Sequence, residues 1–134
     1  MIFDTSVVLK ILKEKDFFEN IKSYVDEEVK ITSITVYELL RGAAYLKLKK
    51  HREKELNIIL SMISELEILP FERDDAKIAA YIWSKLKSKE TMINDADILI
   101  AAVCIGNKQK LLTIDSDYKK IKEVYDEFEV ELLN

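Results

Sequence analysis

The sequence predicts an α/β fold in which helices cover a parallel sheet. Short apolar or β-branched stretches alternate with helical patterns along the whole chain, which is the order of elements in parallel sheets. The first stretch, residues 1–3, is apolar on both faces, as in a strand at the middle of such a sheet. Only two Gly and one Pro occur in 134 residues, which favours helices joined by short loops.

Five stretches have the composition of strands. They cover residues 1–3, 29–32, 67–70, 110–113 and 128–133. The third stops at Pro70, because a proline restricts the residue before it. The last alternates polar and apolar residues, so we expect it at an edge of the sheet.

Helical periodicity fills the segments between these strands. The predicted helices cover residues 5–13, 17–27, 34–48, 56–66, 74–89, 98–105 and 118–125. Ser33 is the expected N-cap of the third helix, and the charge-dense stretch KLKKHREKE, residues 47–55, separates it from the fourth. Residues 98–105 are nearly all apolar, which predicts a buried helix, and Gly106 and Asn107 are expected to end it as a C-cap.

Length and composition predict one domain over residues 1–134 and limit its partners. No apolar stretch approaches the ~20 residues of a membrane span, and no signal peptide is evident, so we expect a cytoplasmic protein without membrane contact. The lone Cys104 excludes an internal disulfide and fits a reducing compartment. The net charge of -4 predicts no general attraction to nucleic acid, which leaves a local basic patch or a bound cation as the route to such contact.

Four acidic residues occupy equivalent places in the predicted fold. Asp4 follows the first strand, Glu38 lies early on the helix after the second, Asp97 opens the buried helix, and Asp115 follows the fourth strand. In a right-handed parallel sheet these positions meet at one edge. Crowded carboxylates repel one another unless they are protonated or neutralised by a cation, and oxygen ligands suit Mg²⁺ or Mn²⁺. One His and one Cys cannot build a typical zinc site.

Each of these acids also has a simple structural explanation. Asp4 is a good N-cap for the helix that begins at Thr5, and Glu38 alone would be a solvated helix residue. Asp97 favours a helix start, and Asp115 suits a turn. The prediction of a metal site therefore depends on the four residues as a set.

Four segments resemble, in the same order, the motifs of PIN-domain ribonucleases of the VapC toxin type. The first is MIFDTSVV, residues 1–8, and the second is ITSITVYELLRGA, residues 31–43. The third is NDADILIAA, residues 94–102, and the fourth is LLTIDSDY, residues 111–118. Together they nearly span the chain, and their combination is specific to that family.

The resemblance implies a three-layer α/β/α sandwich with a central parallel sheet of four to five strands, the PIN-like fold. It also implies an endoribonuclease that depends on Mg²⁺ or Mn²⁺ and hydrolyses RNA phosphodiester bonds with a metal-activated water. Such a protein is the toxin of a type II toxin–antitoxin pair. Its expected partners are an RNA substrate and a VapB-like antitoxin, and its expected assembly is a homodimer.

The resemblance also assigns roles by position. Asp4, Glu38 and Asp97 match the main acids of the family and Asp115 matches the fourth, so we expect all four to be catalytic and to hold the metal. Thr5 or Ser6 matches a small hydroxyl that orients the first acid or a water, and either residue could instead only start the helix.

Three further residues are predicted to be accessory. Arg41 is one helical turn after Glu38, where it would either contact an RNA phosphate or form an ion pair with Glu38. Asp95 is predicted to be accessory rather than a main acid, because residues two apart on a helix do not share a face and Asp97 is the better match. Asp117 lies in a loop that looks one residue shorter than in many relatives.

Two alternative functions fit parts of the sequence. A PIN module without activity would serve as a protein-binding scaffold, although the intact acids argue against it. A receiver-type signalling domain also combines a parallel sheet with acids around Mg²⁺. It requires a phosphoacceptor Asp after the third strand, where this chain has Pro70 and Phe71.

Overall fold

A five-stranded, entirely parallel sheet forms the centre of the molecule in the computed structural model, which describes all of residues 1–134. Its strands are β1 Ile2–Phe3, β2 Lys30–Thr32, β3 Glu67–Leu69, β4 Leu111–Thr113 and β5 Val130–Leu132. They lie in the order β3-β2-β1-β4-β5, so the first strand is central and the last is at an edge, as predicted.

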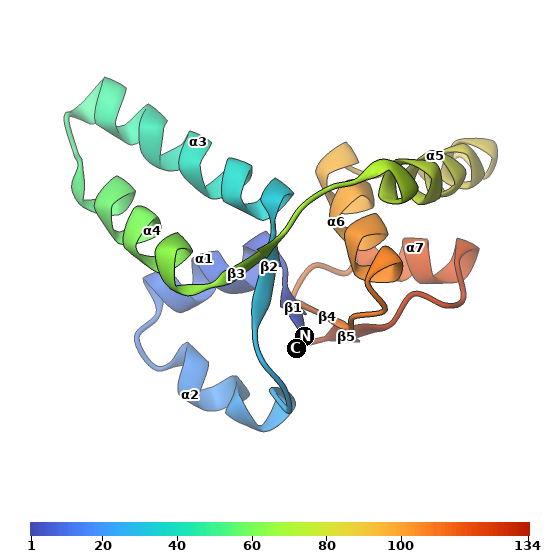
Figure 1. The fold of residues 1–134 in the computed structure, drawn as a ribbon, viewed down its shortest axis with the longest axis horizontal. Helices are drawn as coiled ribbons and strands as arrows, with labels where there is room; N and C mark the ends of the chain where they lie inside the picture. The colour runs from blue at the N-terminus through green and yellow to red at the C-terminus, as the bar shows by residue number, and fades with distance from the viewer.

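Helices cover both faces of the sheet and give three layers (Figure 1). They are α1 Thr5–Lys13, α2 Phe17–Ile21, α3 Ser33–Lys50, α4 Lys54–Glu65, α5 Arg73–Ser88, α6 Asp95–Gly106 and α7 Tyr118–Val124. The predicted α/β/α sandwich is therefore confirmed. None of these helices combines the length and apolar character needed to cross a bilayer.

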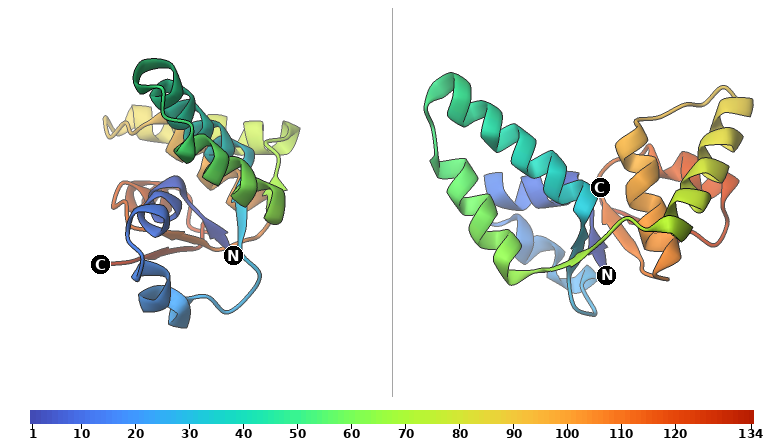
Figure 2. Two further views of the ribbon diagram at one scale, coloured as in Figure 1. Left: turned by 90° about the vertical axis from the view of Figure 1, so that its left-hand side faces the viewer. Right: turned by 45° about the horizontal axis from the view of Figure 1, so that its top comes forward.

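Alternating side chains of the central strands divide the core between the two faces. Ile2 and Leu111 join a buried cluster with residues of α5, α6 and α7. Phe3 and Leu112, the next residue in each strand, join a second cluster with residues of α1, α3 and α4. Figure 2 shows the same division, with α1 to α4 on one side of the sheet and α5 to α7 on the other. This alternation is the period of two that a strand imposes.

Helix α6 is the most buried helix, as its composition predicted. Its residues from Ile100 to Cys104 are each 0 % exposed. It packs most extensively on α5, which covers it from outside. The first turn of α6, which carries Asp95 and Asp97, lies at the end of the helix nearest to α3 (Figure 1). The packing of α6 thus fixes the position of Asp97.

The predicted helix over residues 17–27 is wrong in extent. Helix α2 ends at Ile21, and a 3-10 turn over Lys22–Tyr24 ends the helical segment. The following residues are held by the chain terminus instead. The Met1 ammonium pairs with Glu27 at 2.8 Å and donates to the Glu28 carbonyl at 3.1 Å.

The predicted N-cap of α3 is also wrong. Thr32 is the N-cap of α3, because its hydroxyl accepts from the Thr35 amide at 3.1 Å, whereas the Ser33 hydroxyl accepts from the Phe71 amide at 3.2 Å. Helix α6 ends as predicted, with Gly106 as its last residue and Asn107 as its C-cap. The left-handed residue is Lys108, with φ of 53°, which follows the cap. Helix α3 also continues through part of the charge-dense stretch, to Lys50.

Candidate metal centre at the carboxyl edge of the sheet

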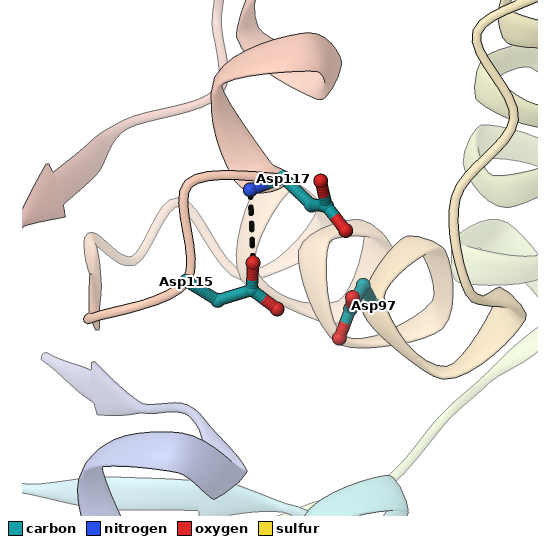
Figure 3. A group of neighbouring side chains, drawn as sticks. All are labelled: Asp97, Asp115 and Asp117. Carbon is teal, nitrogen blue, oxygen red and sulfur yellow. Dashed lines mark hydrogen bonds between the residues drawn. The ribbon is translucent and has the colours of Figure 1, made fainter.

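Three carboxylates from separate parts of the chain converge beyond the carboxyl ends of the strands. Asp97 comes from the first turn of α6, Asp115 from the loop after β4, and Asp117 from the residue before α7. One oxygen of each lies within 4.8 Å of the others, and all three side chains are partly exposed. Figure 3 shows the three side chains grouped in the space between α6 and the loop before α7. The arrangement offers oxygen ligands only, which suits a hard divalent cation.

The loop between β4 and α7 is shaped by its own polar groups. The Asp115 amide donates to the Thr113 hydroxyl at 2.9 Å. The Asp117 amide donates to Asp115 Oδ1 at 2.9 Å, which is the dashed line in Figure 3. This turn, in which an Asp side chain accepts from the amide two residues on, brings both acids to one side of the loop.

Asp97 is the acid whose proton affinity the fold changes most clearly. Burial is the main cause that raises its pKa to about 7, and repulsion by Asp115 contributes, with smaller repulsions from Asp4 and Glu38. The Tyr118 hydroxyl donates to Asp97 Oδ1 at 3.2 Å and opposes this rise. A carboxylate under such repulsion gains from a nearby cation.

Asp4 is almost completely buried and held by hydrogen bonds. It is 2 % exposed. The Ser6 hydroxyl lies 2.7 Å from Oδ1 and 2.9 Å from Oδ2, and the Thr113 hydroxyl donates to Oδ2 at 2.7 Å. The Val7 amide donates to Oδ1 at 3.0 Å, so Asp4 is also the N-cap of α1. Burial raises the pKa of Asp4, and these hydrogen bonds oppose that effect.

Glu38 is held on both sides and is 13 % exposed. The Thr5 hydroxyl donates to Oε1 at 2.6 Å, and the Arg41 guanidinium lies 3.5 Å from Oε2. Arg41 also lies over the Tyr37 ring, 5.2 Å from its centroid. The structure therefore contains the Glu38–Arg41 ion pair, one of the two interpretations of Arg41.

The structure separates the predicted acids into three groups. Asp97 and Asp115 lie together, and Asp117 joins them rather than standing apart. Asp4 and Glu38 act on Asp97 through their charge. Asp95 is exposed on the first turn of α6 and is not part of the group. Of the two small hydroxyls, Ser6 contacts Asp4 and Thr5 contacts Glu38.

Two residues at the site are absent from the set that the sequence predicts. Thr113 is fully buried and contacts Asp4 and the Asp115 amide. Its position at the end of the fourth strand, next to the central strand, could have indicated this. Tyr118 is predicted only as the start of a helix. Its hydroxyl reaches Asp97 through packing of α6 on α7, for which the sequence carries no local signal.

Comparison with known proteins defines the class of this one. The family model of the PIN domain matches residues 1–124, so the chain belongs to the PIN domain family. This membership is the one that the four sequence motifs indicated, and it leaves no basis for the receiver-type alternative.

Individual proteins similar to this chain are named ribonuclease VapC. The chain is 30 % identical over 125 residues to ribonuclease VapC of Rickettsia bellii, with 92 % of each protein covered. It is 36 % identical over 103 residues to ribonuclease VapC3 of Methanocaldococcus jannaschii, covering 76 % of this chain and 95 % of that one.

Solved structures share the fold over nearly the whole chain. The structure of VapBC2 from Rickettsia felis bound to a DNA fragment from its promoter matches with a TM-score of 0.78 at 23 % identity, covering 100 % of both chains. That of FitAcB from Neisseria gonorrhoeae matches with a TM-score of 0.75 at 26 % identity, covering 96 % of this chain and 94 % of that one.

Proposed function

We propose that this protein is an endoribonuclease that requires Mg²⁺ or Mn²⁺ and acts as the toxin of a type II toxin–antitoxin pair. The observation that carries the proposal is the convergence of Asp97, Asp115 and Asp117 at the carboxyl edge of the sheet. The relatives named ribonuclease VapC support RNA as the substrate. A cytoplasmic location and a homodimeric assembly stay predictions.

The residues at this edge fit a divalent cation. The three carboxylates of the group offer oxygens within 4.8 Å of one another, and burial together with repulsion from Asp115 raises the pKa of Asp97 to about 7. Asp97, Asp115 and Asp117 would hold the ion. Asp4 and Glu38 add negative charge, and their hydrogen bonds fix that charge in place. When bound, the cation would supply Lewis acidity toward an RNA phosphate.

Residues of this chain would orient the reacting groups. Thr5 and Arg41 hold the Glu38 carboxylate from two sides. In the proposed reaction it would accept a proton from the attacking water. The guanidinium of Arg41 is exposed and adjacent, where it would contact a phosphate oxygen while keeping Glu38 in place.

A groove between α1, α3 and α4 is the proposed site for the antitoxin. Its cavity volume is about 630 Å³, and its lining includes Leu9, Leu12 and Ile58, each more than a third exposed. Glu38 and Glu55 also line it, as do Lys13, Arg52 and Lys54, and one oxygen of Glu55 is buried without a hydrogen-bond partner. A partner segment with apolar side chains would fit. Structures of the similar VapBC proteins are of such two-component systems.

The nuclease proposal is tested with purified protein and a mixed RNA substrate. We expect cleavage with Mn²⁺ or Mg²⁺, no cleavage with EDTA, and no cleavage by Asp97→Asn or Asp115→Asn while the circular dichroism of both variants stays native. Asp95→Asn, an exposed position on the same helix as Asp97, is the matched control and should keep wild-type activity. Cleavage in EDTA would overturn the metal requirement, and an inactive wild type under all metal conditions would favour the scaffold alternative.

A further inference from the structure

Tyr118 combines a core position with a polar contact to the acidic group. It is the first residue of α7, is 1 % exposed, and packs with its ring 6.2 Å from the ring of Phe128. A phenylalanine would fill the same space. The hydroxyl needs a partner when buried, and it finds that partner in Asp97 Oδ1 at 3.2 Å.

The Asp97 carboxylate is otherwise free of hydrogen bonds within the protein. Asp4 accepts from Ser6, Val7 and Thr113, and Asp115 accepts from the Asp117 amide. For Asp97, the Tyr118 hydroxyl is the one donor in the structure. It therefore limits rotation of the Asp97 side chain, occupies Oδ1 and leaves Oδ2 without a protein donor.

The position of Tyr118 in the chain links it to the other acids. It directly follows Asp117, and its amide donates to the Asp115 carbonyl at 3.4 Å. The turn that presents Asp115 and Asp117 thus also presents the hydroxyl that holds Asp97, although Asp97 belongs to a different helix.

We propose that Tyr118 is a positioning residue that holds the Asp97 carboxylate in the orientation needed to bind the divalent cation. This inference rests on the metal site of the proposed function. It differs from a purely structural role, in which Asp97 would only satisfy a buried hydroxyl. A phenol is protonated at neutral pH, so Tyr118 acts as a donor whether or not a cation is present.

The test is Mn²⁺ affinity, measured through the electron paramagnetic resonance signal of free Mn²⁺, in the wild type and in Tyr118→Phe. This substitution removes the hydroxyl and keeps the ring. We expect Tyr118→Phe to raise the Kd for Mn²⁺ by about tenfold or more, the usual effect of losing a residue that orients a metal ligand. Tyr125→Phe, which removes a tyrosine hydroxyl at the other end of α7, is the control and should leave the Kd unchanged.

Three outcomes separate this inference from the proposed function. If the wild type and Tyr118→Phe bind Mn²⁺ with equal affinity, the role of Tyr118 is overturned and the metal site stands. A lower Tm of the metal-free variant with an unchanged Kd also overturns that role, because it shows a structural contribution alone. If the wild type binds no Mn²⁺, the metal site itself is wrong.

A second measurement needs no variant. In wild-type protein the Tyr118 hydroxyl proton is buried, so we expect it to exchange slowly enough to be observed by NMR. It should remain protected when Mg²⁺ is added, because the hydroxyl still donates to Asp97 in the loaded site. Loss of protection on Mg²⁺ addition would overturn the proposal.

Discussion

Asp97 shows how a single residue can be unfavourable for the fold and useful for a site. Its carboxylate lies partly buried among other acids, and its pKa of about 7 is well above the ordinary value of an aspartate, 3.8. Between about pH 4 and pH 7, Asp97 is therefore protonated in the folded state and ionised in the unfolded chain. The free energy of unfolding is therefore unaffected by this carboxyl at low pH and falls as the pH rises toward 7, because ionisation of Asp97 is less favourable in the folded state.

This sign leads to a prediction for Asp97→Asn in the absence of divalent cations. Asparagine resembles the protonated acid, so the variant should have a higher Tm than the wild type at pH 8 in EDTA. The difference should shrink as the pH is lowered toward 5. Calorimetry at pH 8 and pH 5 measures the Tm of the variant and the wild type. Asp95→Asn, an exposed position on the same helix, is the control. A variant that is less stable at pH 8 would contradict the electrostatic account.

The contact between Ser6 and Asp4 leads to a prediction about stability. Its hydroxyl contacts both oxygens of a carboxylate that is 2 % exposed. Ser6→Ala should lower the free energy of unfolding by roughly 1.5–3 kcal/mol, the range for a hydrogen bond to a charged group. Urea denaturation measures the loss. Ser84→Ala is the control, since that exposed hydroxyl donates only to the Tyr81 carbonyl one turn earlier, and it should change stability by less than about 0.5 kcal/mol.

At the scale of helices, the two glycines of the chain have opposite surroundings. A methyl group at Gly106 in α6 would overlap Asp75 Oδ1, because the buried Asp75 carboxylate of α5 lies against it. A methyl group at Gly42 in α3 would meet nothing within 4 Å. Gly106 thus permits the close contact of α5 with α6 that keeps α6 in place.

We predict opposite effects of the same substitution at these two positions. Gly106→Ala should destabilise the protein by about 1–3 kcal/mol, because the new atom overpacks the α5–α6 contact. Gly42→Ala should stabilise it by about 0.5–1 kcal/mol, because alanine loses less conformational entropy in a helix. Chemical denaturation of both variants measures the difference, and a stabilising Gly106→Ala would contradict the assigned role of Gly106.

The elements also show which features a sequence can predict. The strands and most helices follow from local patterns of apolar residues, and the acids at the sheet edge follow from the order of strands and helices. The errors arise where residues far away in the sequence determine the local structure. The helix after residue 17 ends early because Met1 binds the segment that follows it. The sequence also gives no sign that Gly106 contacts Asp75, because the two residues are far apart along the chain.

The same distinction holds within the candidate site. Asp97 and Asp115 can be placed together because both positions follow from the order of elements. The sequence ranks Asp117 too low, because its place depends on the turn in which its amide binds the Asp115 carboxylate. Tyr118 depends on packing between α6 and α7, and no local pattern reports such a contact.

For the whole molecule, the proposed cation site predicts a link between metal and stability. A ligand that binds only the folded state stabilises it, by about 2.7 kcal/mol at a hundredfold excess over Kd. Mg²⁺ or Mn²⁺ should therefore raise the Tm of the wild type. The rise should be absent in Asp115→Asn, and a thermal shift of equal size in both proteins would show that the ion binds elsewhere.

The place of β1 in the sheet bears on when the molecule becomes functional during its synthesis. Strand β1 is made first, yet it pairs with β4, and the hydrogen bond from Thr113 to Asp4 joins residues 109 positions apart. Contacts this distant in sequence carry a large loop-closure cost and cannot form before both residues have been synthesised. A nascent chain that has emerged only as far as α6 already contains Asp4, Glu38 and Asp97, but it lacks the strand that seats Asp4 and the loop that supplies Asp115. The acidic edge therefore assembles only when synthesis is nearly finished, and incomplete chains released from the ribosome should lack its chemistry.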